Sequence, residues 1–234
     1  MSLTFSQGKT HFEQANYQEA IACFTQVLTE NPLHVDGLYW RGLCRYKLQE
    51  YQKAIKDYDD ALNISTHNAN LYYERGLAQH MLNHREEALQ DFDKALVLDP
   101  QNPFRYASRA FVKAAYNMIQ EAIEDYIRAL ELDPEDAITQ NNLGLLYERI
   151  GYKAEAQALF AKADKVSGLE NNGGKVYYEE NLSASKKEAN TSSVASSPTI
   201  NHQSTTRWQI VKQVFTTKAT FKAFIDYWKK RLKA

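Results

Sequence analysis

The residues whose types and spacing could support chemistry are few, and each set lacks something that the chemistry needs. Gly8, Lys9 and Thr10 match the end of a phosphate-binding loop. That loop also requires an earlier glycine, where Leu3 stands here, and a strand before it. The sequence therefore predicts no nucleotide site.

The sequence predicts neither a metal site nor a redox-active thiol pair. His80 and His84 lie one helical turn apart, but no third ligand is near them in the sequence, and a structural zinc needs four. Cys23 and Cys44 are more consistent with inert packing than with a redox pair. No serine–histidine–acid arrangement stands out. We therefore expect no catalytic residues, no metal ligands, no cofactor, no small-molecule substrate and no enzymatic activity.

One set of charged residues has a regular spacing. An arginine is followed sixteen residues later by an aspartate three times, as Arg41 and Asp57, Arg75 and Asp91, and Arg109 and Asp125. At the equivalent positions nearer the two ends both charges are missing, with Gln7 and Cys23 on one side and Leu143 and Leu159 on the other. Because the two positions change together, we predict an ion pair in each case, and arginine suits a partly buried carboxylate. The pairs could fix helix register or form a site for an acidic ligand.

The elements that position these residues repeat every 34 residues, which marks an array of one supersecondary unit. Gly76, Ala88, Phe92 and Ala95 have counterparts 34 residues earlier: Gly42, Ala54, Tyr58 and Ala61. Apolar residues recur at helical spacing within each unit, so each is predicted to be a pair of antiparallel helices. The small residues would let the helices approach closely, and the aromatic residue would fill the remaining space.

This pattern resembles the tetratricopeptide repeat, which has small residues at its eighth and twenty-seventh positions, alanine at the twentieth, an aromatic at the twenty-fourth and proline at the thirty-second. The resemblance spans five units: 1–34, 35–68, 69–102, 103–136 and 137–168. Val27, Thr66 and Gly168 depart from it. It implies an all-α, right-handed superhelical solenoid of five helix pairs over residues 1–168.

The resemblance also implies a function, because the concave face of such a solenoid binds extended or helical peptides. In this family the first helix of each unit lines that face. The corresponding residues here are Tyr39, Trp40, Leu43, Tyr46, Asn70, Tyr73, Glu74, Leu77, Phe104, Ser108, Phe111, Asn141 and Asn142. We expect Tyr39, Trp40 and Tyr73 to be exposed, whereas Leu43, Leu77 and Phe111 could equally pack between units.

Some members of the family grip the carboxylate at the end of a chaperone tail with Lys, Asn and Arg. Phe5, Lys9, Trp40, Asn70 and Glu74 stand at those positions and match the set poorly. The groove is therefore expected to prefer apolar or aromatic ligands.

Charge and composition divide the chain. Residues 1–168 carry 17 basic and 24 acidic side chains, whereas residues 207–234 carry 8 and 1. Residues 169–206 are rich in Ser, Thr and Asn and are predicted to be a disordered linker. With no apolar run long enough for a membrane span or signal peptide, and only two cysteines, we expect a soluble cytoplasmic protein.

Residues 207–234 are predicted to form a basic amphipathic helix. Its aromatic and basic residues include Trp208, Phe215, Phe221, Phe224, Trp228, Lys229, Lys230 and Arg231. It could bind an anionic membrane, dock onto a partner or occupy the chain's own groove, and nucleic acid is not expected. The sequence therefore predicts a non-catalytic scaffold or adaptor that binds a polypeptide of unknown identity. A peripheral, membrane-tethered assembly factor is the alternative.

Overall fold

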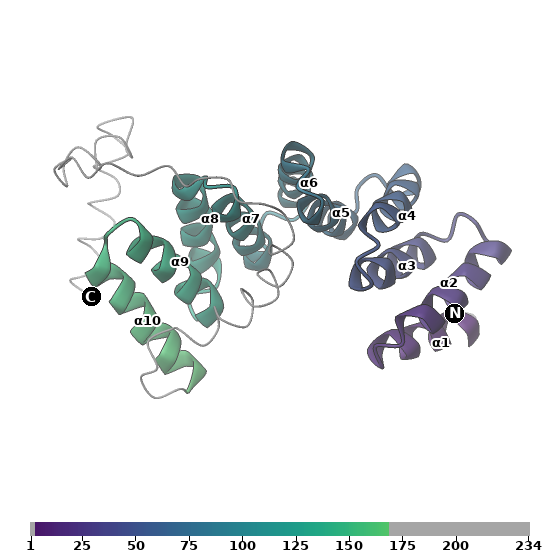
Figure 1. Ribbon diagram of the computed structural model, residues 1–234, viewed down its shortest axis with the longest axis horizontal. Helices are drawn as coiled ribbons and strands as arrows, with labels where there is room; N and C mark the ends of the chain where they lie inside the picture. Colours follow the sequence, from purple (N-terminus) through teal and green to yellow (C-terminus); the bar gives the residue numbers. More distant parts are fainter. Residues whose placement is uncertain (1–2, 169–234) are drawn as a thin grey trace, which may run out of the picture. The chain divides into compact units, whose positions relative to one another are not determined.

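The computed structural model describes residues 3–168, and this part of the chain consists of helices joined by short turns (Figure 1). The ten helices are α1 (Leu3–Glu13), α2 (Tyr17–Glu30), α3 (Val35–Lys47), α4 (Tyr51–Ile64), α5 (Ala69–Met81), α6 (Arg85–Leu98), α7 (Pro103–Ala115), α8 (Ile119–Leu132), α9 (Ala137–Arg149) and α10 (Lys153–Ser167). None of these helices is both long and apolar enough to cross a bilayer. The predicted linker, 169–206, and the predicted amphipathic helix, 207–234, lie outside the described residues.

The helices pack in the order of the chain. Each odd-numbered helix contacts the even-numbered helix that follows it, and each even-numbered helix contacts the odd-numbered helix of the next unit. Some odd-numbered helices also contact one another directly, as α1 and α3, α3 and α5, and α7 and α9 do. The predicted all-α solenoid of five helix pairs is therefore confirmed.

Glycine allows the two helices of a unit to come close together. A Cβ atom added to Gly42 would lie 2.5 Å from Cε1 of Tyr58, and one added to Gly144 would lie 2.5 Å from Cε1 of Phe160. Contacts this short are repulsive, so no other residue fits these positions without movement of the ring. Tyr58 is fully buried as a result. The small residues and the aromatic thus play the parts that the repeat pattern predicted.

The turns inside the units share a backbone conformation that the sequence pattern did not indicate. Ala15, Gln49, Asn83 and Asn117 have φ angles of 57°, 60°, 59° and 62°, and Gly151 has a φ of 91° in the fifth unit. A left-handed conformation costs an L-residue such as Ala15 about 1–2 kcal/mol. The packing of the two helices must therefore compensate for this cost in four of the five turns.

The buried core is divided into clusters along the array. One cluster surrounds Tyr58 and reaches Leu71 of the third unit, and another joins Tyr126 of α8 to Leu143 of α9. Between the third and fourth units the buried cluster consists of Ala88, Phe92 and Val112 alone, with half-buried side chains around it. This junction therefore has little buried apolar core, and polar side chains reinforce it.

Candidate binding face

An arginine–aspartate pair joins the two helices of each central unit, as the sixteen-residue spacing predicted. The Nη2–Oδ1 distances are 2.7 Å for Arg41 and Asp57, 2.6 Å for Arg75 and Asp91, and 2.6 Å for Arg109 and Asp125. In each pair the arginine Nε also donates to the carboxylate, which makes the contact bidentate. The three aspartates are buried, so these pairs hold charges that would be costly to bury alone.

The arginines also reach back to the preceding unit, which sequence reasoning missed. Nη1 of Arg75 donates to Oδ1 of Asp59 over 2.6 Å, and Arg109 pairs with Asp93 in the same way. Nη1 of Arg41 instead donates to the hydroxyl of Thr25 over 3.4 Å. Asp59 and Asp93 lie sixteen residues before Arg75 and Arg109, so the same spacing read backwards would have found them. The result is an arginine ladder that connects neighbouring units.

The ladder leaves little charge for an external ligand. Asp57 receives a second cation from Arg45 at 2.7 Å, and Asp125 receives one from Lys113 at 2.8 Å. Gln79 occupies the equivalent position of the third unit, where burial raises the pKa of Asp91 and the hydrogen bonds from its arginine partly oppose the rise. The geometry favours the register-fixing interpretation over an acidic-ligand site.

Polar side chains connect α5 to α7 at the junction between the third and fourth units. The buried guanidinium of Arg105 donates to Oδ1 of Asn70 over 2.7 Å. The hydroxyls of Tyr73 and Ser108 are 3.2 Å apart and share a hydrogen bond. Three predicted groove residues, Asn70, Tyr73 and Ser108, therefore use polar atoms within the fold.

The two histidines with metal-like spacing have protein partners instead. Nδ1 of His80 is 3.0 Å from the hydroxyl of Tyr116, and Nδ1 of His84 is 3.1 Å from Oε1 of Gln79. His80 is half-buried rather than a surface residue, and burial lowers its pKa. Within residues 3–168 no group of three His, Cys, Asp or Glu side chains is arranged to hold a metal ion.

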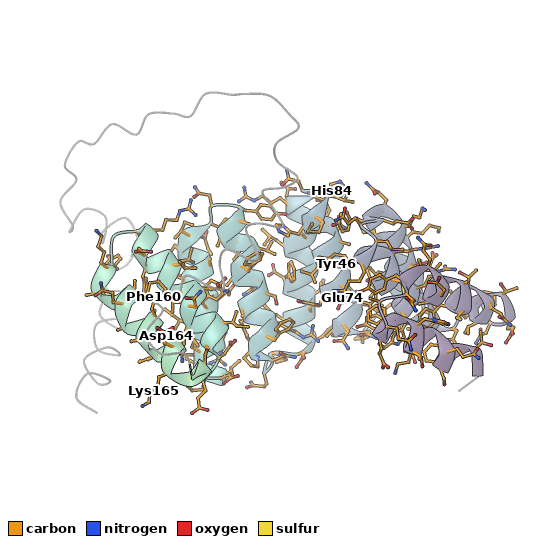
Figure 2. The ribbon with its side chains drawn as sticks, turned by 60° about the horizontal axis from the view of Figure 1, so that its bottom comes forward. Tyr46, Glu74, His84, Phe160, Asp164 and Lys165 are labelled. Carbon is orange, nitrogen blue, oxygen red and sulfur yellow. The ribbon has the colours of Figure 1, made fainter. Side chains whose placement is uncertain are left out.

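A carboxylate surrounded by tyrosines lies where α3, α4 and α5 meet. Burial raises the pKa of Glu74 to about 7. Burial also raises the pKa of Tyr39 to about 12, and the charge of Glu74 adds to this effect. The same charge acts on Tyr46, Tyr58 and Tyr73. Tyr46 and Glu74 lie near each other in Figure 2. We call Glu74 and the four tyrosines on which its charge acts, Tyr39, Tyr46, Tyr58 and Tyr73, the Glu74 cluster.

Exposed apolar side chains lie on three of the odd-numbered helices, and one of them contacts this cluster. Phe104 and Phe111 are 60% and 51% exposed and lie two turns apart on α7. The ring of Phe104 is 5.5 Å from that of Tyr73, which links it to the Glu74 cluster. Met81 of α5 and Ile138 of α9 are exposed as well. These odd-numbered helices present what we call the odd-helix face, and its uncovered apolar residues are typical of an interaction surface.

Two of the predicted groove residues, Asn141 and Trp40, pack within the fold. Asn141 is 1% exposed, because its short side chain ends among its neighbours, whereas tyrosines stand at the equivalent positions 39 and 73. Trp40 is half-buried instead of exposed, since its ring packs 5.2 Å from Phe12 and 6.3 Å from Phe24. Lys9 also lies over the Trp40 ring, at 4.9 Å. Both residues therefore contribute to packing.

The other predicted groove residues keep some access to solvent. Asn70 is exposed, and those that are half-buried are Tyr39, Leu43, Tyr46, Tyr73, Glu74, Leu77, Ser108 and Asn142. Tyr39 and Tyr73, like Trp40, are therefore less exposed than the sequence predicted. Leu77 packs beside the small cluster at the junction of the third and fourth units, as its alternative interpretation allowed. Phe111 does not pack between units to any great extent, because half of its surface is exposed.

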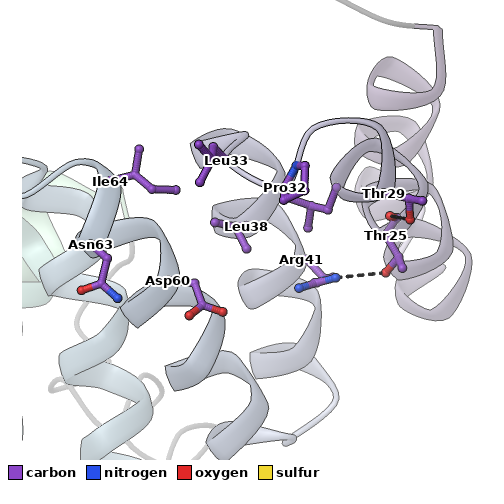
Figure 3. Close-up of a pocket in the computed structure, with 10 residues that line it drawn as sticks. Thr25, Thr29, Pro32, Leu33, Leu38, Arg41, Asp60, Asn63 and Ile64 are labelled. Atoms are coloured by element: carbon purple, nitrogen blue, oxygen red, sulfur yellow. Dashed lines mark hydrogen bonds between the residues drawn. The ribbon is translucent and has the colours of Figure 1, made fainter.

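A separate pocket of about 470 Å³ lies between α2, α3 and α4, and the sequence did not predict it (Figure 3). Leu28, Leu33 and Ile64 supply part of its apolar lining, and Thr25 and Asp60 part of its polar lining. Figure 3 shows the hydrogen bond from Arg41 to Thr25 at one side of it. The lining contains neither a nucleophile with an adjacent base nor a pair of free cations.

Comparison with protein families finds tetratricopeptide repeats along most of the described residues. Models described as "Tetratricopeptide repeat" match residues 5–69, 69–102 and 137–168, and one described as "TPR repeat" matches residues 117–151. A search of curated proteins gave no match.

Solved structures with the same fold include MamA 41-end from Desulfovibrio magneticus RS-1. It is 18% identical, with a TM-score of 0.65, and the match covers 73% of this chain and 96% of that one. TTC0263, a thermophilic TPR protein in Thermus thermophilus, is 22% identical over 76% and 97% of the two chains, with a TM-score of 0.61. YrrB, described as a TPR protein with an unusual peptide-binding site, is 19% identical over 78% and 90%, with a TM-score of 0.58.

Proposed function

Because this chain belongs to the tetratricopeptide repeat family, we propose that it is a non-catalytic scaffold that binds a polypeptide segment of a partner on its odd-helix face. The observation that carries the proposal is the pair Phe104 and Phe111, which remain exposed on α7 beside half-buried Tyr73. Aromatic side chains of this kind supply binding energy at low entropic cost. YrrB, which has the same fold, is described as a TPR protein with an unusual peptide-binding site, and this supports peptide binding as the function.

Selection of phage-displayed random peptides on the immobilised full chain tests this proposal. A Phe104→Ser, Phe111→Ser double variant should lose most enrichment, because each phenyl group buried by a ligand contributes about 1.5–3 kcal/mol. A Leu33→Ser, Val97→Ser double variant is the matched control, since both leucine and valine there are exposed but lie off the odd-numbered helices. Loss of enrichment in the control alone would place binding away from the odd-helix face and contradict the proposal.

The absence of catalysis is part of the proposal. Purified full-length chain should turn over no substrate of a broad hydrolase and transferase panel in the absence of a partner. Turnover that survives extensive purification and is lost on unfolding would contradict it.

Peripheral membrane tethering through residues 207–234 remains an alternative that no described residue supports. Co-sedimentation of the full chain with anionic and neutral vesicles tests it. A Lys229→Gln, Lys230→Gln, Arg231→Gln variant is the comparison, because each basic residue near an anionic surface contributes about 1 kcal/mol. Binding to anionic vesicles that the variant loses would favour this alternative, and equal recovery with neutral vesicles would not.

The proposal also places the chain in the cytoplasm, with a protein partner and without nucleic acid. Its support is that Cys23 and Cys44 are both free thiols, as expected in a reducing compartment. Cell fractionation with detection of the native chain tests this placement, and recovery from an oxidising compartment would contradict it.

A further inference from the structure

We propose that the Glu74 cluster is a receptor for a single cationic side chain, lysine or arginine, of the bound segment. This inference rests on the proposed function, because it specifies what the segment must present. The cluster comprises Tyr39 and Tyr46 of α3, Tyr58 of α4, and Tyr73 and Glu74 of α5. It joins the exposed aromatic surface of α7 through the contact between Tyr73 and Phe104.

The carboxylate of Glu74 has no partner in residues 3–168. It makes no ion pair or hydrogen bond there, whereas the buried Asp57, Asp91 and Asp125 are each held by an arginine. A half-buried carboxylate without a partner has lost part of its hydration and gained no hydrogen bond in return. A cationic ligand would supply the missing interaction.

The cations already near Glu74 do not fill this role. Lys47 of α3 and Arg105 of α7 both act to lower the pKa of Glu74, but burial outweighs them. The Arg105 guanidinium donates to the Asp99 carboxylate, the Asn70 amide oxygen and the backbone carbonyl of Ala69. Lys47 is exposed and forms no ion pair within the described residues.

The hydroxyl of Tyr58 is a second polar group that lacks a partner. It is buried without a hydrogen-bond partner among the described residues, and after burial the charge of Glu74 is the largest influence raising its pKa. The Tyr58 hydroxyl is buried, so an external ligand does not reach it, and the carboxylate of Glu74 is the acceptor that a ligand can use. An ammonium group has three donors and a guanidinium has five, so either could bind the carboxylate oxygens of Glu74.

The surrounding rings favour the same chemistry. Tyr39, Tyr46 and Tyr73 are half-buried, and the negative charge of Glu74 acts on all three. Tyrosine faces attract cations through their quadrupole, and the attraction grows as the cation loses water. A carboxylate or phosphate would instead be repelled by Glu74. The partner segment should therefore carry a basic residue among apolar ones.

The protonation of Glu74 gives binding a pH dependence. Its pKa of about 7 means that raising the pH from 6 to 8 converts most of it to the anion. The other groups that face it are Lys47, Tyr39 and Tyr46 of α3, Tyr58 of α4 and Arg105 of α7. On α6, Asp91 faces Arg75 and not Glu74. Affinity for a cationic segment should therefore rise with pH across this range.

Selection of random peptides on the full chain tests the inference separately from the proposed function. The chain should enrich peptides with lysine or arginine at one fixed position among apolar residues. A Glu74→Gln chain should enrich peptides without that basic position, and Glu86→Gln, an exposed residue of α6, is the control that should behave like the unaltered chain. Enriched peptides that lack a basic position would overturn the inference and leave the proposed function standing, and no enrichment at all would overturn both.

Synthetic copies of one enriched peptide, with lysine or norleucine at the basic position, give the quantitative test by fluorescence polarisation. At pH 8 the lysine peptide should bind the unaltered chain about tenfold more tightly, as expected for a charge-assisted hydrogen bond. On Glu74→Gln the two peptides should bind alike, and a Lys47→Met chain should keep the preference. The preference should shrink at pH 6. A lysine preference of equal size on Glu74→Gln would overturn the inference.

Discussion

Replacing Arg75 with leucine removes the cation that holds both Asp91 and Asp59. Asp91 is 4% exposed and has no second cation, unlike Asp57 and Asp125. Arg75→Leu therefore leaves the buried carboxylate of Asp91 without a cation, because the third unit has no second basic residue paired with it. This makes the third unit the most sensitive place to test the arginine ladder.

The size of the effect follows from the burial of the two carboxylates. Removing one partner of a buried ion pair costs roughly 3–5 kcal/mol. The contact between Arg75 and Asp59, whose side chain is 48% exposed, adds at most about 1 kcal/mol. Burial already raises the pKa of Asp91, so without Arg75 its carboxylate can take up a proton and avoid part of the cost of being charged. We therefore expect a loss at the lower end of this range, about 3 kcal/mol in the free energy of unfolding at pH 7.

Urea unfolding of the full chain, followed by circular dichroism at 222 nm, measures this loss. With an m-value of about 3 kcal/mol/M the midpoint should fall by about 1 M. The fifth unit shows that two leucines fit these positions, since Leu143 and Leu159 occupy the places equivalent to 75 and 91 and are buried in an apolar cluster. An Arg75→Leu, Asp91→Leu double variant should recover at least half of the loss. A double variant as unstable as the single one would refute uncompensated charge as the cause.

Three further predictions concern stability. In the folded chain the pKa of Glu74 is raised to about 7 from 4.5, so the free energy of unfolding should fall as pH rises between these values, by on the order of 2–3 kcal/mol. Glu74→Gln should remove this fall in urea midpoints measured at pH 5 and 8, and an unchanged pH profile would contradict the assignment. Gly42→Ala should destabilise by about 1–3 kcal/mol, since its Cβ would lie 2.5 Å from Tyr58, and a thermal melt should show a smaller loss for Gly76→Ala, whose nearest contact is 3.2 Å. Ala15→Gly should stabilise by about 0.5–1 kcal/mol, because Ala15 has a φ of 57° that glycine adopts at little cost; a lower melting temperature would show that the turn is not strained.

The fold was predictable because the same small and aromatic residue types recur at fixed positions along the chain. A small residue and an aromatic recur at the positions of Gly42 and Tyr58 in each later unit, so one unit could be checked against the next. The close contact itself recurs between Gly144 and Phe160. The pairs of the arginine ladder within each unit were predictable for the same reason. Their second carboxylates were missed because Asp59 and Asp93 belong to the preceding unit, and only the forward spacing was considered.

The candidate site was less predictable, because position in a repeat says which helix face a residue lies on and not how far it reaches. Asn141 stands where Tyr39 and Tyr73 stand, but its side chain is too short to reach the surface. Trp40 is large enough to reach its neighbours in the first unit and packs against them. The role of Glu74 depends on burial among side chains from three helices, which spacing along one helix cannot reveal.

The arginine ladder repeats the same pairing in successive blocks of the chain. Arg75 and Arg109 each pair with an aspartate sixteen positions before and one sixteen positions after them, and Asp59 and Asp93 occupy equivalent positions in successive blocks. If residues 69–102 were excised, Arg109 would meet Asp59 behind it and keep Asp125 ahead. A chain that lost or duplicated one such block would therefore keep arginine–aspartate pairs between neighbouring units. Loss of residues 69–102 would also remove Asn70 and Tyr73, so Arg105 and Ser108 would lose those partners.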